Sequence, residues 1–97
     1  MDEPVLRGSA AVDEARLLHD IARKHAPVPK LVKRIDFRFG EDSTTGSPAV
    51  WIRLVAQEDL NPSKAKIAKL LRLEDEIRAE ILASGSERWP YFEIVTE

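Results

Sequence analysis

Arginine and aromatic side chains recur at alternate positions in several β-branched and aromatic-rich segments of this 97-residue chain. Alternate residues of a strand lie on the same face of a sheet, so these side chains would gather on one surface. Guanidinium groups and aromatic rings together are typical of protein interface centres, and the same groups stack single-stranded RNA bases on sheets. We expect a partner-binding face made of Arg34, Arg38, Trp51, Arg53 and Tyr91.

A polar stretch at residues 40–48 is the second candidate site. Its Gly, Asp, Ser and Thr residues supply positive φ angles and local side-chain-to-backbone hydrogen bonds. A calcium loop needs more carboxylates at alternate positions and a late glutamate, so a self-stabilised turn is the preferred interpretation over a cation site. Whether the stretch also contacts a protein stays open. Its candidate residues are Glu41, Asp42, Ser43 and Thr44.

The sequence lacks the motifs expected for disulfides, metal binding, nucleophilic catalysis or phosphate binding. The absence of cysteine excludes disulfides, thiol nucleophiles and thiolate metal sites. The spacing of His19 and His25 puts them on different sides of a helix. Ser47 is not in a nucleophile elbow, and the glycines are too scattered for a phosphate-binding loop. We therefore expect no catalytic residue, metal site or cofactor, and an enzyme is the third choice among the functions considered.

Composition indicates one soluble domain. Hydrophobic residues make up 43% of the chain and charged residues 33%, with 15 basic and 17 acidic residues and a net charge of −2. This balance is not that of a general nucleic-acid binder, although residues 30–40 are locally basic. There is no apolar run of about 18 residues and no signal peptide. We expect a cytoplasmic, bacterial protein without a membrane partner.

The elements that position the candidate face begin with a hairpin. Strict alternation predicts a strand over residues 31–39, and a second strand is expected over residues 49–56 after the polar loop. The uncharged set of each strand should face the core, and the arginines and Trp51 should face outward. The inward residues are Ile35, Phe37, Phe39, Val50, Ile52 and Leu54.

Two helices and a third strand complete the expected elements. Ser9 caps a helix over about residues 10–25, and Asn61 and Pro62 begin a long helix that ends near residue 83. A short strand follows over residues 91–95. The expected core stripes are Val12, Ala15, Leu18, Ile21 and Ala22 in the first helix, and Ile67, Leu70, Leu71, Ile77 and Ile81 in the second.

The predicted fold class is α+β with the order αββαβ. Residues 1–9 are expected to form a flexible leader and residues 10–97 a single domain. Prolines precede the second and third strands, as edge strands allow, so we expect a three-stranded antiparallel sheet of order 2-1-3. Both helices should pack on one face and leave Trp51 at least partly accessible. The alternative is that the first helix covers the outer face.

Two segments resemble a group of small bacterial proteins of unassigned function. The first is Arg-Phe-Gly-Glu-Asp-Ser-Thr from residue 38 with Pro-Ala-Val-Trp-Ile from residue 48, and the second is Arg-Trp-Pro-Tyr from residue 88. Members of that group share a Phe-Gly-x-Asp-Ser-x-Gly-x-Pro-Ala-Val-Trp type hairpin and a closing Trp-x-Tyr strand. The present chain has an extra Thr before Gly46. The resemblance implies an αββαβ protein and no particular activity.

The sequence thus predicts a non-catalytic interaction module. An unidentified protein partner on the outer sheet face is the first choice, and single-stranded RNA on the same face is the alternative. The oligomeric state stays open.

Overall fold

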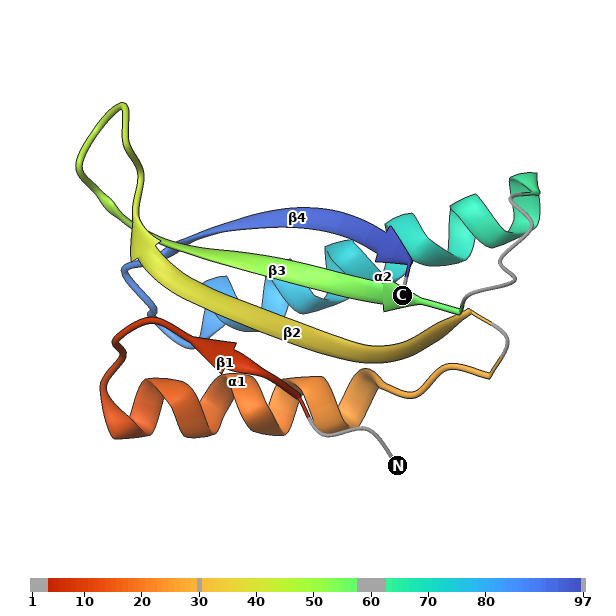
Figure 1. Ribbon diagram of the computed structural model, residues 1–97, viewed down its shortest axis with the longest axis horizontal. Coiled ribbons are helices and arrows are strands. Elements are labelled where there is room, and N and C mark those ends of the chain that lie inside the picture. The colour runs from red at the N-terminus through yellow and green to blue at the C-terminus, as the bar shows by residue number, and fades with distance from the viewer. Residues whose placement is uncertain (1–3, 30, 58–62, 97) are drawn as a thin grey trace.

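The computed structural model describes residues 4–29, 31–57 and 63–96, and it consists of one twisted sheet and two helices (Figure 1). The sheet has four strands in the order β1-β2-β3-β4. The central strands β2 and β3 form an antiparallel hairpin, while β1 runs parallel to β2 and β4 runs parallel to β3. The elements in chain order are β1 (Leu6–Arg7), α1 (Val12–His25), β2 (Val32–Glu41), β3 (Pro48–Ala56), α2 (Lys64–Ala83) and β4 (Trp89–Thr96).

The α+β class is confirmed, but the expected three-stranded antiparallel sheet of order 2-1-3 is wrong. β4 runs antiparallel to β2, as expected, yet its neighbour is β3. The 20 residues of α2 span roughly 30 Å, enough to carry the chain back along β3, so that β4 starts beside the start of β3. The position beside β2 is taken by β1, which makes the sheet mixed.

The N-terminal strand lies within the stretch expected to be a flexible leader, so that prediction was wrong for Leu6 and Arg7. They pair in parallel with Phe37 and Arg38. Gly8 has a φ of 86°, and a Cβ there would lie 2.3 Å from the Phe39 carbonyl oxygen. Only glycine fits so close to β2, so this residue lets the chain leave the sheet edge and turn into α1.

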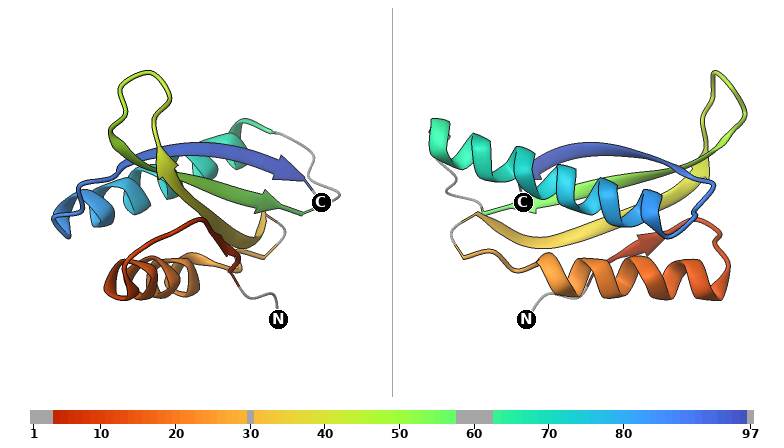
Figure 2. Two further views of the ribbon diagram at one scale, coloured as in Figure 1. Left: turned by 60° about the vertical axis from the view of Figure 1, so that its left-hand side comes forward. Right: turned by 180° about the vertical axis from the view of Figure 1, so that it is seen from behind.

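Both helices lie on the same side of the sheet, as Figure 2 shows when the molecule is seen from behind. They cover the inner face, which carries the uncharged alternate residues of β2 and β3. The expected inward orientation of these residues is confirmed, because all of them are buried together with α1 and α2. The main inner-face contributors are Ile35, Phe37, Phe39, Val50, Ile52, Leu54, Leu18, Ile21, Leu70, Leu73, Ile77 and Ile81.

Helix α1 begins two residues later than predicted. Its N-cap is Ala11, which has no side-chain capping hydrogen bond, so the expected cap by Ser9 is wrong. Val12 is exposed, whereas Leu18, Ile21 and Ala22 are buried as predicted. The acidic first turn and basic last turn match the helix dipole.

Helix α2 is capped by Ser63, whose hydroxyl accepts a hydrogen bond from the Lys66 amide at 3.2 Å. The predicted cap residues, Asn61 and Pro62, lie outside the described residues. The buried stripe includes Leu73, while Ile67 and Leu71 are exposed, so the predicted stripe was turned too far around the helix. Those two exposed side chains flank the core on one side of α2.

Candidate functional site

The outer face is the side of the sheet opposite the helices, and one row of side chains crosses it from edge to edge. The strand register places Arg7 beside Arg38, Arg38 beside Trp51, and Trp51 beside Tyr91. The Arg38 guanidinium carbon lies 4.1 Å from the centroid of the Trp51 ring. The Trp51 and Tyr91 rings stack at 5.8 Å with an interplanar angle of 19°. The row therefore holds Trp51 between a cation and a second aromatic ring.

The next row along the sheet consists of ion pairs. The Arg34 Nε donates to Asp36 at 3.0 and 3.1 Å, and the Arg53 Nε donates to Glu93 at 2.8 Å. Asp36 is in turn the register partner of Arg53. The structure thus brings all the predicted face residues to one surface, and it adds carboxylates that offset the arginine charge. The more exposed of the two pairs, Arg53 with Glu93, contributes only about 0–1 kcal/mol to stability.

A glycine makes room for the central ring. A Cβ on Gly40 would lie 3.1 Å from a carbon of the Trp51 ring, which is closer than nearly all real contacts of a Cβ. The indole of Trp51 therefore lies over the backbone at Gly40. Trp51 is half-buried by this contact and by its two ring neighbours, and its remaining surface faces solvent.

The polar loop is linked to the face through one hydrogen bond. The Tyr91 hydroxyl donates to Asp42 Oδ2 at 2.5 Å, while Asp42 Oδ1 accepts from the backbone amides of Thr44 at 2.7 Å and Thr45 at 3.2 Å. The Tyr91 hydrogen bond, followed by those from Thr44 and Thr45, lowers the pKa of Asp42 below its ordinary value. The same hydrogen bond raises the pKa of Tyr91.

The other candidate residues of the polar loop are characterised by their position and exposure. Glu41 ends β2, and Ser43 and Thr44 are exposed. Gly46 takes a positive φ of 74°, and its amide donates to the Asp42 carbonyl at 2.7 Å, which closes the turn. Because Asp42 uses both carboxylate oxygens within the chain, the loop has the features of a self-stabilised turn.

Sequence reasoning missed Arg88 as a structural clamp. Its Nη1 donates to the carbonyls of Gly40 at 2.9 Å and Ala49 at 3.0 Å, and its Nε donates to Glu14 at 2.8 Å. Its Nη2 reaches the Ser9 carbonyl at 3.2 Å. One side chain therefore connects the hairpin, the start of α1 and the start of β4. A single polar residue before a strand has no periodic pattern that would have predicted this.

Two further residues of the outer face were also missed. Arg7 lay in the expected leader, where two residues are too few to show an alternation. Trp89 was assigned to a turn, but it is the first residue of β4 and its side chain is 54% exposed. Counting back by two from Tyr91 would have placed Trp89 on the outer side.

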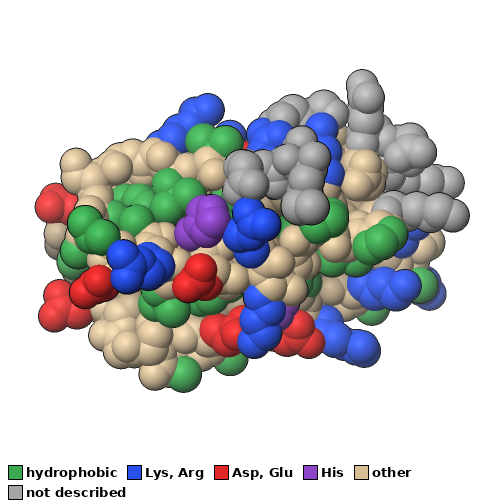
Figure 3. Space-filling view, turned by 90° about the horizontal axis from the view of Figure 1, so that it is seen from below, with side chains coloured by type: hydrophobic (Ala, Val, Ile, Leu, Met, Phe, Trp, Pro, Cys, Tyr) green, Lys and Arg blue, Asp and Glu red, His purple; other side chains and the backbone are tan. Residues whose placement is uncertain are grey.

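The side chain of His25 lies against carboxylates of α2. His25 Nε2 contacts Glu80, whose other carboxylate oxygen accepts from Lys24 at 2.6 Å. These hydrogen bonds, from Lys24 and then His25, lower the pKa of Glu80. Among residues 4–29, 31–57 and 63–96, no group of three His, Cys, Asp or Glu side chains is placed to hold a metal ion. Seen from the α1 side, basic and acidic side chains are interspersed (Figure 3).

The acidic stretch of α2 is also engaged within the chain. Burial raises the pKa of Glu74, as its position at the edge of the buried stripe requires. Arg78 pairs with Asp75 at 2.8 Å, three residues before it on the helix. Asp75 and Arg78 thus form an ion pair within the helix, while Glu74 lies at the edge of the buried stripe.

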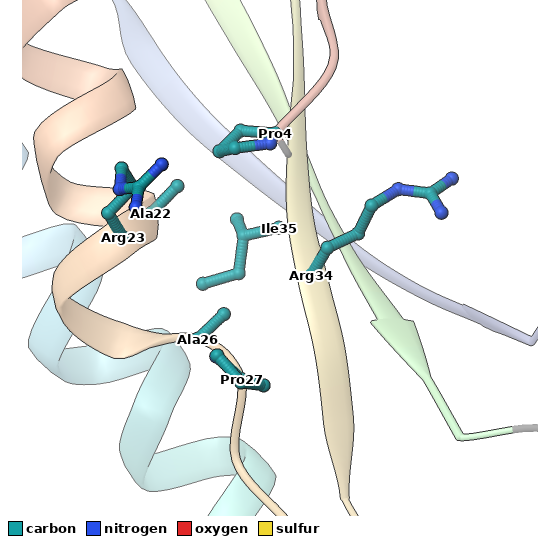
Figure 4. A pocket seen from close by; sticks show the side chains of 7 residues that line it. All are labelled: Pro4, Ala22, Arg23, Ala26, Pro27, Arg34 and Ile35. Carbon is teal, nitrogen blue, oxygen red and sulfur yellow. The ribbon is translucent and has the colours of Figure 1, made fainter. Parts of the chain in front are cut away.

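A cavity of about 160 Å³ lies between the end of α1 and β2 (Figure 4). Ile35, Ala22 and Ala26 line it, while Arg34 extends away from it on the far side of β2. Its described lining contains no nucleophile and no carboxylate, so it has no catalytic constellation.

The fold and the outer face define an α+β domain whose sheet is covered by helices on one side only. No protein-family model matches the chain, and searches of curated proteins and of solved structures find no match either. The resemblance to the bacterial αββαβ group therefore stays a prediction. No helix in the described part of the chain is long and apolar enough to cross a membrane.

Proposed function

We propose that this protein is a small non-catalytic interaction module that binds a protein partner through the outer face of its sheet. The observation that carries the proposal is the one-sided placement of the helices, which leaves Trp51, Arg38 and Tyr91 on an open face (Figure 2). Trp, Tyr and Arg are the residue types most enriched among interface hot spots. The cysteine-free composition suits a reducing compartment, so we assign the module to the cytoplasm.

Trp51 is the expected anchor because its ring is held before any partner arrives. Arg38 lies against it, Tyr91 stacks on it, and Tyr91 is itself fixed by Asp42. A side chain that is already ordered loses little conformational entropy on binding. The polar rim formed by Arg53 and Glu93 would surround this anchor with satisfied hydrogen bonds.

Charge on the outer face favours a protein over RNA. Arg34 and Arg53 are paired with Asp36 and Glu93, so the face lacks the continuous basic track that follows a nucleic-acid backbone. The net charge of −2 points the same way. Single-stranded RNA is the second candidate, because the stacked rings of Trp51 and Tyr91 resemble the aromatic platforms that bind unpaired bases.

The test is affinity capture from the native host followed by titration of the recovered partner. We expect a protein that is retained after RNase treatment and that binds Trp51→Ala more weakly by about 2 kcal/mol, roughly 30-fold. Val12→Ala is the matched control, since it removes an exposed apolar side chain from α1. Equal binding by Trp51→Ala and the parent would refute the proposal.

RNase treatment distinguishes a protein partner from an RNA partner. If recovery depends on RNA, the second candidate is correct, and Arg38→Ala should then reduce the salt dependence of binding because fewer counterions are released.

A further inference from the structure

The outer edge of β4 is long and open. β4 has 8 residues and pairs with β3 along its whole length, and no other strand in the described part of the chain pairs with it. Edge strands are usually blunted by short length, lysine, proline or a bulge. The opposite edge, β1, has only 2 residues, whereas β4 is long and carries Pro90 and one charged side chain, Glu93. β4 therefore presents a row of backbone donors and acceptors.

The inner side of the same edge is incompletely covered. Ile94 is 44% exposed, although its register partner Leu54 on β3 is 0% exposed. On α2, Ile67 is 48% and Leu71 55% exposed. The core therefore thins out toward this edge of the sheet.

The exposed side of α2 is turned toward β4. Ile67, Leu71 and Arg78 share one side of the helix by their spacing, and the Arg78 guanidinium carbon lies 5.0 Å from the centroid of the Phe92 ring. The first turns of α2 project past the end of β4 (Figure 1). We call the open edge of β4 together with Ile67, Leu71 and Ile94 the edge shelf.

We propose that the edge shelf is a self-association site at which β4 of a second copy of this chain adds antiparallel to β4. The added strand must be exposed, extended and apolar at alternate positions on the side that faces α2. β4 itself meets these conditions, because Pro90, Phe92 and Ile94 are its inner-side residues and its edge is open. A two-fold axis normal to the sheet would fill both edge shelves with the same contacts.

Cross-strand pairing selects a register for this dimer. An axis at Phe92 sets Tyr91 opposite the second copy's Glu93, and Trp89 opposite its Val95. An aromatic side chain opposite a β-branched one, as in the pair of Trp89 with Val95, stabilises an antiparallel pair. An axis at Glu93 would instead oppose two carboxylates, which is destabilising. The first register also covers Trp89, the most exposed aromatic side chain of β4.

The proposed dimer leaves the centre of the partner-binding face accessible. Edge pairing uses the backbone of β4 and places its outer residues Trp89, Tyr91 and Glu93 beside the second copy, while Trp51 on β3 and Arg38 on β2 lie away from the new contact. Failure of one proposal therefore does not decide the other.

The test is sedimentation equilibrium of the full chain from about 1 μM to about 1 mM. We expect a monomer–dimer equilibrium whose dissociation constant rises about tenfold or more in Ile94→Lys, because a lysine pointing inward at an edge opposes strand addition. Val12→Lys is the matched control, since it places the same charge at an exposed apolar position on α1. Amide exchange of residues 91–95 should slow as the dimer forms.

Several results would overturn the proposal. One is a monomer at every concentration, and another is a dimer that Ile94→Lys leaves unchanged. If Ile94→Lys fails to fold, Leu71→Lys on exposed α2 surface decides the question by the same criterion. Dissociation of the dimer by Trp51→Ala, with no effect of Leu71→Lys, would place the interface on the outer face and contradict the edge shelf.

Discussion

Trp51 and Ile52 are adjacent in β3, yet they face environments held together by different forces. Ile52 belongs to the inner face, where side chains are stabilised by removal of apolar surface from water, roughly 25 cal/mol per Å². Trp51 belongs to the outer face, where it is held by a ring stack with Tyr91 and a cation contact with Arg38, beside the ion pair of Arg53 with Glu93. Such directional contacts fix geometry while leaving atoms accessible. The comparison indicates that apolar burial on the inner face stabilises the fold, whereas the contacts on the outer face order a ring that stays partly accessible.

The largest effect should follow from opening the inner face. Phe37 is among the largest fully buried side chains, and Phe37→Ala should lower the free energy of unfolding by about 3–5 kcal/mol because it leaves a cavity. Urea unfolding followed by circular dichroism measures this change. Arg38→Ala, one residue along the same strand, is the control and should change stability by about 0.5 kcal/mol or less. Equal stability of Phe37→Ala and the parent would mean that the two faces are not energetically different.

The second largest effect should come from the Arg88 clamp at the boundary between the faces. Arg88→Met keeps much of the side-chain bulk but removes the donors to Gly40, Ala49 and Glu14. Leaving partly buried acceptors unpaired should lower stability by about 2–3 kcal/mol. Arg78→Met, which breaks the more exposed pair with Asp75, is the matched control and should have an effect of about 0.5 kcal/mol. Similar losses of stability in both variants would show that Arg88 does not act as a structural clamp.

A smaller stability effect is expected at Trp51. Trp51→Ala should lower the free energy of unfolding by about 1 kcal/mol, far less than Phe37→Ala, because the ring is only half-buried. In a Trp89→Phe background, a soluble quencher should reduce Trp51 fluorescence because the ring is partly accessible. A shielded, blue-shifted signal together with unfolding of Trp51→Ala would show that the outer face is a second core layer.

The smallest effect concerns the Tyr91–Asp42 hydrogen bond and its pH dependence. The pKa of Asp42 is lowered in the folded state, so its contribution is present above the ordinary value of 3.8 and is lost as pH falls through the folded pKa. Tyr91→Phe keeps the ring but removes the donor, so the stability difference from the parent should shrink below about pH 4. Urea unfolding between about pH 2 and pH 7 measures this difference. A difference independent of pH would contradict the assignment.

The sequence correctly predicted which residues of the hairpin face inward, but it did not predict which strand lies beside each strand of the hairpin. Alternation in β2 and β3 follows from backbone geometry, so Phe37 and Ile52 were correctly placed inward. Alternation does not identify the adjacent strand, so β4 was placed beside the wrong partner. In α2, leucines at 70, 71 and 73 spread apolar character around the helix, and only packing shows that Leu71 is exposed.

The candidate site was predicted in part for the same reason. Face residues that follow the period of two could be identified from sequence, and they do share one surface. The pairing of Arg53 with Glu93 depends on register across strands, which the sequence does not specify. Arg34 and Asp36, by contrast, lie two residues apart on one face of β2, so their pairing follows from the same period of two. The hydrogen bond between Tyr91 and Asp42 joins residues 49 positions apart, so it required the fold.

The contacts of Arg88 also bear on the order in which parts of the chain fold. They join residues 74 and 79 positions apart, from the start of α1 to the start of β4. The β2–β3 hairpin, by contrast, closes over a short loop, and long-range closure is entropically slower than local pairing. We therefore expect the contacts of Arg88 to form after the hairpin. Arg88→Met should then raise the rate of unfolding more than it lowers the rate of folding.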